Sequence, residues 1–253
     1  MMIAGLSIEE ASRRFAVCTF DGVIGRPDGM RGDPNHRSPG LSGGHVEWVN
    51  ESLSDGLSVL ETIEHFQPTV LLGLSAAGKI FDEKVITAMG KVNERPIIMP
   101  MSNPTSKCEC TPEEAYRWTD GRAVVATGSP FPPVEVNGRT YTPSQCNNMY
   151  IFPGIGLASS VSGVTKITDK MFYLAAEACT NTMNEEERQE GRTFPSIMRI
   201  REVNRNIAIA VIEEAIRCGL TTKITKDDIV TGIPQLVERK MYFPIYSPLI
   251  TKR

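Results

Sequence analysis

Short apolar runs and stretches of helical periodicity alternate along this chain, an order typical of α/β proteins. The short runs predict strands at residues 15–19, 69–75, 96–101 and 123–126, and residues 134–141 predict a hairpin turning at Asn137-Gly138. The helical spacings predict helices at 7–14 and 54–66, one ending at Met89, others beginning at Thr111 and Thr168, and a long one from about 196 to 218. The pattern therefore predicts an α/β fold with a mainly parallel sheet.

Two of these helices begin with specific capping signals. Ser7 followed by Glu10 is the pattern of a capping box, and Thr111-Pro112-Glu113 combines an N-cap, a first-turn proline and an acidic first turn. The long C-terminal helix repeats apolar residues at helical spacing, which we interpret as core: Val203, Ile207, Ala210, Val211 and Ala215.

Three other segments carry weaker patterns. Residues 25–44 are rich in Gly, Pro, Asp, Asn, Arg and His and predict a long, mobile loop. Residues 154–163 are noted only as rich in Gly and Ser. Residues 223–253, with Tyr242-Phe243-Pro244-Ile245-Tyr246, are interpreted as an extended tail that wraps or docks on something. We therefore divide the chain into a domain at 1–222 and a C-terminal tail at 223–253.

Two short asparagine motifs stand where predicted strands end. Ser102-Asn103-Pro104-Thr105 follows the apolar run at 96–101, and Gln145-Cys146-Asn147-Asn148 precedes Phe152-Pro153-Gly154. Ligands of open α/β sheets bind at the carboxyl ends of the strands, so two such tips could converge on one small polar ligand. An asparagine offers an acceptor and two donors, which suits a carboxylate, a hydroxyl or a carboxamide. The alternative is that both motifs are ordinary turns, where Asn, Pro, Ser and Gly are common.

A longer series of motifs surrounds these asparagines. In chain order they are Asn93-Glu94-Arg95-Pro96, Ser102-Asn103-Pro104-Thr105, Glu109-Cys110-Thr111, Glu113-Glu114-Ala115-Tyr116, Gly121-Arg122, Gly128-Ser129-Pro130-Phe131, Asn147-Asn148 and Phe152-Pro153-Gly154. In this order they resemble the NAD-binding domain of malic enzymes, which oxidatively decarboxylate malate to pyruvate with NAD or NADP and a divalent metal. The resemblance runs from about Gly5 to Gly219. It implies a Rossmann-like, doubly wound sheet, incomplete here, followed by C-terminal helices.

The resemblance also implies roles for particular residues. It places Asn103 at the junction of malate and nicotinamide, and Asn147 on the malate carboxylate with Asn148 beside it. The turn of Gly73, Leu74 and Ser75 would run beside the cofactor, where small residues let backbone N–H groups approach a ligand. The alternative for that turn is that small residues serve helix–sheet packing.

The upstream part of the malic enzyme pattern is missing from this chain. That part carries the catalytic tyrosine and lysine, the acidic metal ligands and the glycine-rich dinucleotide fingerprint. Catalytic and metal-binding residues are therefore expected upstream, with Mg or Mn as the metal of the complete enzyme. Thr19 stands where many members have the ribose-binding Asp, with Asp21 two places later, so the choice between NAD and NADP stays open. A missing first strand would also leave an unpaired sheet edge and an uncovered apolar face.

Composition narrows the choice of partners. The net charge of -3 gives no reason to expect nucleic acid or an anionic membrane, and no apolar run approaches the length of a membrane span. The six cysteines and three histidines lack the spacing of a zinc site, so reduced, mostly buried thiols in an intracellular protein are expected. Cytoplasm and mitochondrion are not distinguished. By resemblance, the ligands would be malate and pyruvate, and the complete enzyme a homodimer or homotetramer.

Three hypotheses on function stay open. The chain is part of a malic enzyme that is active when complete; or it is a short, non-catalytic protein that binds a dinucleotide or joins full-length subunits; or it is active with groups supplied by a separate chain.

Overall fold

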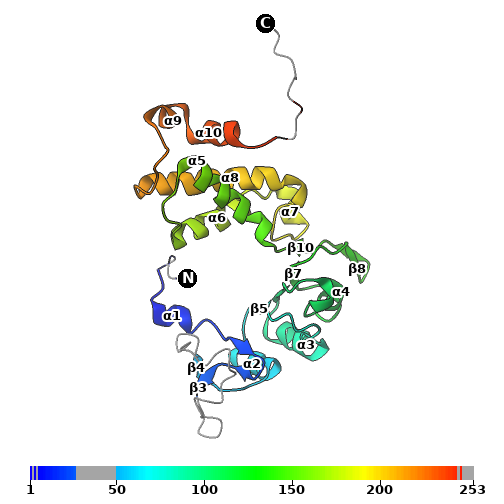
Figure 1. Ribbon diagram of the computed structural model, residues 1–253. Helices are drawn as coiled ribbons and strands as arrows, with labels where there is room; N and C mark the ends of the chain where they lie inside the picture. The colour runs from blue at the N-terminus through cyan, green and yellow to red at the C-terminus, as the bar shows by residue number, and fades with distance from the viewer. Residues whose placement is uncertain (2, 4, 27–49, 244–245, 247–253) are drawn as a thin grey trace. The chain divides into compact units, whose positions relative to one another are not determined.

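The computed structural model describes residues 1, 3, 5–26, 50–243 and 246. Contacts between its residues define two compact units (Figure 1). We call Met1–Asn147 with Arg188–Thr193 the sheet unit, and Asn148–Glu187 with Phe194–Arg253 the helical unit. These two units do not coincide with the domain and tail predicted from the sequence, at 1–222 and 223–253. The predicted boundary between residues 222 and 223 stays a prediction.

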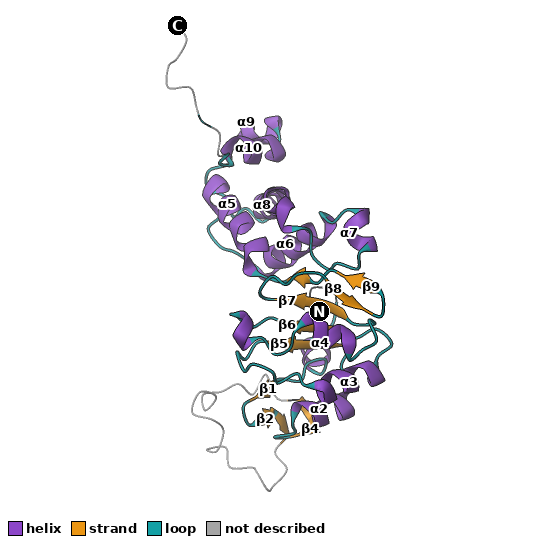
Figure 2. Ribbon diagram, turned by 90° about the vertical axis from the view of Figure 1, so that its right-hand side faces the viewer, coloured by secondary structure: helices purple, strands orange, loops and turns teal. Residues whose placement is uncertain are grey.

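The centre of the sheet unit is a four-stranded sheet in the order β10-β7-β6-β5, in which every neighbouring pair is parallel. Its strands are β5 (Val70–Gly73), β6 (Ile97–Pro100), β7 (Val124–Thr127) and β10 (Ser144–Gln145). Figure 2 shows β5, β6 and β7 side by side. The strands predicted at 69–75, 96–101 and 123–126 are thus confirmed within one or two residues.

The helices of the sheet unit begin at side-chain caps. They are α1 (Ile8–Ser12), α2 (Val59–Phe66), α3 (Glu83–Val92) and α4 (Pro112–Arg117), capped by Ser7, Ser58, Asp82 and Thr111, with the short 3-10 helix η3 (Thr105–Lys107) between the last two. Each cap satisfies backbone donors that a helix start leaves unpaired and contributes about 1 kcal/mol. The predicted capping boxes of Ser7 and Thr111 are confirmed.

One hydrophobic cluster joins these helices to the sheet. Its largest fully buried members are Ile63 of α2, Ile86 and Met89 of α3 and Ile98 of β6. Arg122 stabilises the C-terminal end of α3, because its guanidinium donates to the carbonyls of Gly90, Asn93 and Glu94 at 2.8–3.0 Å.

The remaining strands of the sheet unit form three small pairs. β1 (Cys18–Thr19) pairs antiparallel with β2 (Gly22–Val23), and β3 (Gly25–Arg26) pairs parallel with β4 (Asn50–Ser54). The predicted hairpin is β8 (Val134–Val136) with β9 (Arg139–Tyr141), and it turns at Asn137-Gly138 as expected, both at positive φ.

Two sequence-based predictions for the sheet unit need correction, and a third lies mostly outside the described residues. The strand predicted at 15–19 is reduced to Cys18–Thr19, because the chain turns back at once into β2. The helix predicted from Ser54 begins at Val59, because Ser54 ends β4 and Ser58 is the cap. The loop predicted at 25–44 begins with β3, and its residues 27–44 lie outside the described residues.

β5 is an edge strand with an exposed apolar face. Among the described residues it pairs with β6 alone. Val70, Leu72 and Leu74 alternate along one face and are 39%, 47% and 72% exposed. Soluble sheets normally cover such an edge. The unpaired edge and apolar face expected from the sequence are therefore present in the structure.

The helical unit is built around one long helix. Its helices are η4 (Asn148–Tyr150), α5 (Phe152–Ser162), α6 (Asp169–Asn181), η5 (Ile197–Arg199), α8 (Ile200–Arg217), α9 (Lys226–Thr231) and α10 (Ile233–Lys240), and α7 (Glu185–Gln189) spans the division between the units. α8 packs against α5, α6 and α10. Of the residues predicted as its core, Val203, Ile207, Val211 and Ala215 are buried and Ala210 is half-buried.

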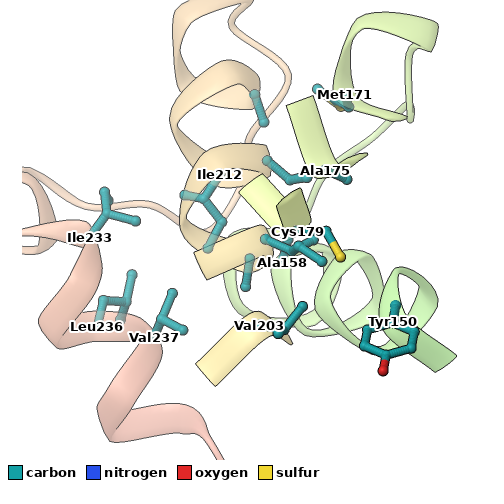
Figure 3. Packing of buried hydrophobic residues seen from close by; sticks show 14 residues of the cluster. Tyr150, Ala158, Met171, Ala175, Cys179, Val203, Ile212, Ile233, Leu236 and Val237 are labelled. Carbon is teal, nitrogen blue, oxygen red and sulfur yellow. The ribbon is translucent and has the colours of Figure 1, made fainter. Parts of the chain in front are cut away.

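One part of the helical unit differs from the sequence-based expectation, and another had no predicted structure. The Gly- and Ser-rich segment forms most of α5. Residues 226–240 of the predicted extended tail form α9 and α10, and Ile233, Leu236 and Val237 are buried in the cluster that contains α8, as Figure 3 shows. The extended interpretation is therefore wrong for this stretch, because its apolar residues at helical spacing bury against a core. Among the described residues, no helix is both long and apolar enough to cross a bilayer.

Candidate functional site

The carboxyl ends of β5, β6, β7 and β10 lie along one edge of the sheet, because the four strands are parallel. Asn103 lies in the loop after β6, and Asn147 follows β10. Both side chains contact the loop after β7, at Ser129 and Gly128 respectively. The two asparagine motifs therefore contact one turn, Gly128-Ser129, and their convergence on one ligand stays a prediction.

Asn103 is held with its amide in one orientation. Its Oδ1 accepts a hydrogen bond from the Ser129 hydroxyl, and its Nδ2 lies 3.4 Å from the Met101 carbonyl oxygen. The residue is exposed, and its peptide bond to Pro104 is cis. With Oδ1 engaged, the side chain offers N–H donors to a ligand rather than an acceptor.

Asn147 is fixed through the same turn. Its Nδ2 donates to the Gly128 carbonyl at 3.2 Å, and Nε2 of Gln145 donates to that carbonyl at 3.3 Å. Gly128 itself donates its N–H to the Pro100 carbonyl at 3.2 Å. Gly128 therefore links the ends of β6, β7 and β10.

Asn148 opens η4 and is the first residue of the helical unit. Its side chain is exposed, and its carbonyl accepts from the N–H of Ile151 at 3.0 Å. The structure thus brings Asn103 and Asn147 together and leaves the predicted substrate contact of Asn148 as a prediction.

The turn after β5 contains the predicted cofactor contacts. Gly73 is buried, whereas Leu74 and Ser75 are exposed. The N–H of Ala76 donates to the Ser102 hydroxyl at 2.9 Å, and the N–H of Ala77 lies 3.4 Å from the Ser75 hydroxyl. These two donors are engaged inside the protein, so at Ala76 and Ala77 the expected approach of free N–H groups to a ligand does not apply. The exposed Leu74 side chain offers an apolar contact instead.

A buried carboxylate lies behind this turn. Glu109 accepts hydrogen bonds from the backbone N–H of Ser102, at 3.3 Å, and from the Ser102 hydroxyl. Sequence reasoning named Ser102, Glu109 and Ser129 only as parts of motifs and gave them no separate role. Hydrogen bonds between loops far apart in sequence leave no periodic pattern that could have revealed them.

Thr19 ends β1, and Asp21 lies in the turn between β1 and β2. The Thr19 hydroxyl donates to the Gly22 carbonyl at 3.2 Å, and the N–H of Asp21 donates to that hydroxyl at 3.3 Å. The Thr19 side chain thus stabilises a tight turn.

The thiols near the sheet edge are poor nucleophiles. Burial raises the pKa of Cys108, and the neighbouring Glu109 carboxylate raises it further. Burial also raises the pKa of Cys110 and of Cys146, which precedes Asn147. A thiol with a raised pKa is largely protonated near neutral pH. None of the six cysteines forms a disulfide, and three of them are buried. Among the residues that the structure describes, no three His, Cys, Asp or Glu side chains gather as a metal site.

A parallel sheet with polar side chains at the carboxyl ends of its strands places the protein in the Rossmann-like class of α/β folds, in which ligands bind at that edge. The chain belongs to the malic enzyme family, since residues 1–216 match the family described as "Malic enzyme, NAD binding domain". The resemblance inferred from the sequence motifs is thereby confirmed.

Individual proteins support this assignment. The NADP-dependent malic enzyme of Dictyostelium discoideum is 40% identical over 245 residues, which cover 96% of this chain and 43% of that protein. The NADP-dependent malic enzyme of Vitis vinifera is 43% identical over 188 residues, 74% of this chain and 31% of that protein. The chain thus spans roughly a third to two fifths of the length of these relatives.

Solved structures agree on the fold. The malic enzyme from Pyrococcus horikoshii Ot3 aligns with a TM-score of 0.52 and 27% identity, over 75% of this chain and 39% of that one. The Entamoeba histolytica malic enzyme aligns with a TM-score of 0.53 and 24% identity, over 74% of this chain and 36% of that one, and shows similarity of fold alone.

Proposed function

We propose that this chain is the cofactor-binding part of an NADP-dependent malic enzyme, which converts (S)-malate to pyruvate and CO2 by oxidative decarboxylation. The observation that carries the proposal is the meeting of Asn103 and Asn147 around Gly128-Ser129 at the carboxyl ends of parallel strands. The choice of NADP over NAD is supported by relatives that are NADP-dependent malic enzymes.

In this proposal the two asparagines position malate. Asn103, whose Oδ1 is engaged by Ser129, donates to an oxygen of malate or of the nicotinamide ribose. Asn147 donates to a malate carboxylate from the end of β10, on the other side of β7 from Asn103. Holding malate and the cofactor in one geometry lowers the activation free energy, because their translational and rotational entropy is already lost on binding. Once a bound ligand covers them, these amides would also discriminate against acids that lack their hydrogen-bond partner.

The nucleotide fits the same edge. Gly73 is buried at the start of the turn after β5, and the next residue, Leu74, supplies an exposed apolar surface. The exposed Asn103 supplies N–H donors. We propose that Leu74 contacts a ring of the nucleotide and that Ser75 lies beside it. Bound beside these residues, NADP in its oxidised form would supply the acceptor for the hydride from C2 of malate.

For the divalent metal, the proposal relies on the resemblance to malic enzymes. The described part of the chain holds no cluster of three metal-ligating side chains. In the complete enzyme, Mg or Mn would be held by residues outside this chain.

The alternative function is that of a non-catalytic protein that binds a dinucleotide or joins full-length subunits. The uncovered apolar face of β5 favours it, because Val70, Leu72 and Leu74 are available to another polypeptide. We propose a homo-oligomer within the cell for either case.

The assay that tests the proposal is malate-dependent reduction of NADP, with pyruvate measured as product. We use "complete protein" for the polypeptide of the source cell that contains this chain, whatever its length. The complete protein should reduce NADP faster than NAD, and residues 1–253 alone should show no turnover. Metal-dependent turnover by 1–253 alone would contradict the assignment of catalytic groups outside this chain. An inactive complete protein that still binds NADP would support the alternative.

A further inference from the structure

Glu109 is a buried carboxylate that the function described above does not yet use. It is 0% exposed, and the ion pairs of the described residues do not include it. Taking a carboxylate out of water costs several kcal/mol unless hydrogen bonds replace the lost water. An apolar residue of similar size would avoid this cost, so the hydrogen bonds of Glu109 need an explanation.

Those hydrogen bonds connect two loops of the strand-end site. Glu109 accepts from both the backbone N–H and the hydroxyl of Ser102, in the loop after β6. The Ser102 hydroxyl in turn accepts from the N–H of Ala76 at 2.9 Å, in the turn after β5. Ala76 has φ +54°, a left-handed conformation that costs a residue with a side chain about 1 kcal/mol or more. The chain of hydrogen bonds holds it there.

The backbone around Glu109 completes the support. Its carbonyl accepts from the N–H of Phe81 at 3.1 Å, and the Cys108 carbonyl accepts from the N–H of Lys79 at 3.1 Å. The Glu109 side chain also lies against Gly73, where an added Cβ would stand 2.7 Å from its Cγ. The backbone of residues 108–109 thus holds the C-terminal end of the 74–81 loop, at Lys79 and Phe81. The Glu109 carboxylate holds the N-terminal end of that loop, at Ala76, through Ser102.

We propose that Glu109 is a positioning residue for the strand-end site, which acts through Ser102 to hold both the 74–77 turn and Asn103. Glu109 is fully buried and touches neither malate nor nucleotide. It fixes the two loops that carry Leu74, Ser75 and Asn103. This inference rests on the proposed function, because that function supplies the ligands, malate and NADP, that the two loops would bind.

The substitution Glu109→Gln tests this role with little change of volume. A carboxylate accepts from both Ser102 donors, whereas an amide has one acceptor and one donor end. If its oxygen faces the hydroxyl, its NH2 opposes the Ser102 N–H. If it is flipped, the Ser102 hydroxyl oxygen receives two donors and its own hydrogen loses its acceptor. Either arrangement loosens the link to Ala76.

The experiment compares Glu109→Gln with Glu113→Gln in the complete protein. Glu113 undergoes the same chemical change on the surface of α4, where it pairs with Arg117 at 2.5 Å. We expect Glu109→Gln to raise the KM for NADP about tenfold, with kcat changed less than about threefold, since it disturbs ligand placement. Glu113→Gln should leave both constants unchanged. Hydrogen exchange of the peptide that contains residues 74–77 should become faster only in Glu109→Gln.

A second variant keeps the test valid if Glu109→Gln does not fold. Ser102→Ala removes the linking hydroxyl, and it should raise the KM for NADP in the same way. The double variant should be no worse than the worse single variant, because both act through one chain of hydrogen bonds. Wild-type constants in Glu109→Gln, or additive effects in the double variant, would overturn the proposal. An inactive wild-type protein would instead contradict the proposed function, and hydrogen exchange would still decide whether Glu109 holds the loop.

Discussion

Replacing Gly128 by alanine is expected to lower kcat/KM for malate by about 100-fold in the complete protein. A Cβ at this position would overlap the Met101 carbonyl oxygen and stand 2.9 Å from Nδ2 of Asn103. The overlap is with backbone, so the loop after β6 must move. Gly128 also binds Asn147 and Gln145 through its carbonyl, so the displacement reaches both asparagines at once.

Gly156→Ala is the matched control for this substitution. Gly156 lies in α5, and nothing stands within 4 Å of an added Cβ. Alanine there should leave the kinetics unchanged and stabilise the helix by up to about 1 kcal/mol. Steady-state kinetics with malate and NADP, together with circular dichroism to verify folding, distinguish the two variants. A folded Gly128→Ala protein with kinetics within about threefold of wild type would show that the turn does not organise the site.

Replacing Gly154 by alanine is expected to destabilise the helical unit by about 2 kcal/mol. Gly154 lies where α5 crosses α8, and an added Cβ would stand 2.6 Å from Cγ2 of Ile207 and 3.0 Å from the Asn204 carbonyl oxygen. Ile207 is fully buried, so the two helices must separate to admit the extra methyl group.

Urea unfolding measures this effect, and Gly156→Ala two residues further on serves again as control. Removing the obstructing side chain supplies a second check, since Ile207→Ala should cost less stability in the Gly154→Ala background than in wild type. If Gly154→Ala is as stable as Gly156→Ala, the close crossing of α5 and α8 is wrong.

Elements whose signals are local could be predicted from the sequence. The capping boxes of Ser7 and Thr111, the turn at Asn137-Gly138 and the strands β5 to β7 each follow from residues adjacent in the chain. Elements that depend on partners distant in sequence were missed. α5 contains glycines that disfavour a helix in isolation, but Gly154 is needed at the crossing with α8.

Some features of the candidate site could likewise be predicted from the sequence, and others could not. The rule that ligands bind at the carboxyl ends of parallel strands is enough to predict from the sequence that Asn103 and Asn147 lie at one edge of the sheet. The turn that joins them could not be predicted, because the contact of Ser129 with Asn103 spans 26 residues. The burial of Glu109 was equally hidden, since a charged residue between two cysteines reads as exposed until the loops around it are placed.

The measurement that tests the central claim most directly is the KM for malate and the dissociation constant for NADP in Asn147→Ala, both in the complete protein. Asn147 is positioned at the strand ends by the Gly128 carbonyl and is proposed to bind the malate carboxylate. Loss of one such hydrogen bond to a charged group should weaken malate binding by roughly 1.5–3 kcal/mol, which raises the KM for malate about 10- to 100-fold. Binding of NADP should change less than about threefold. An equal loss for malate and NADP would contradict the assignment of Asn147 to malate.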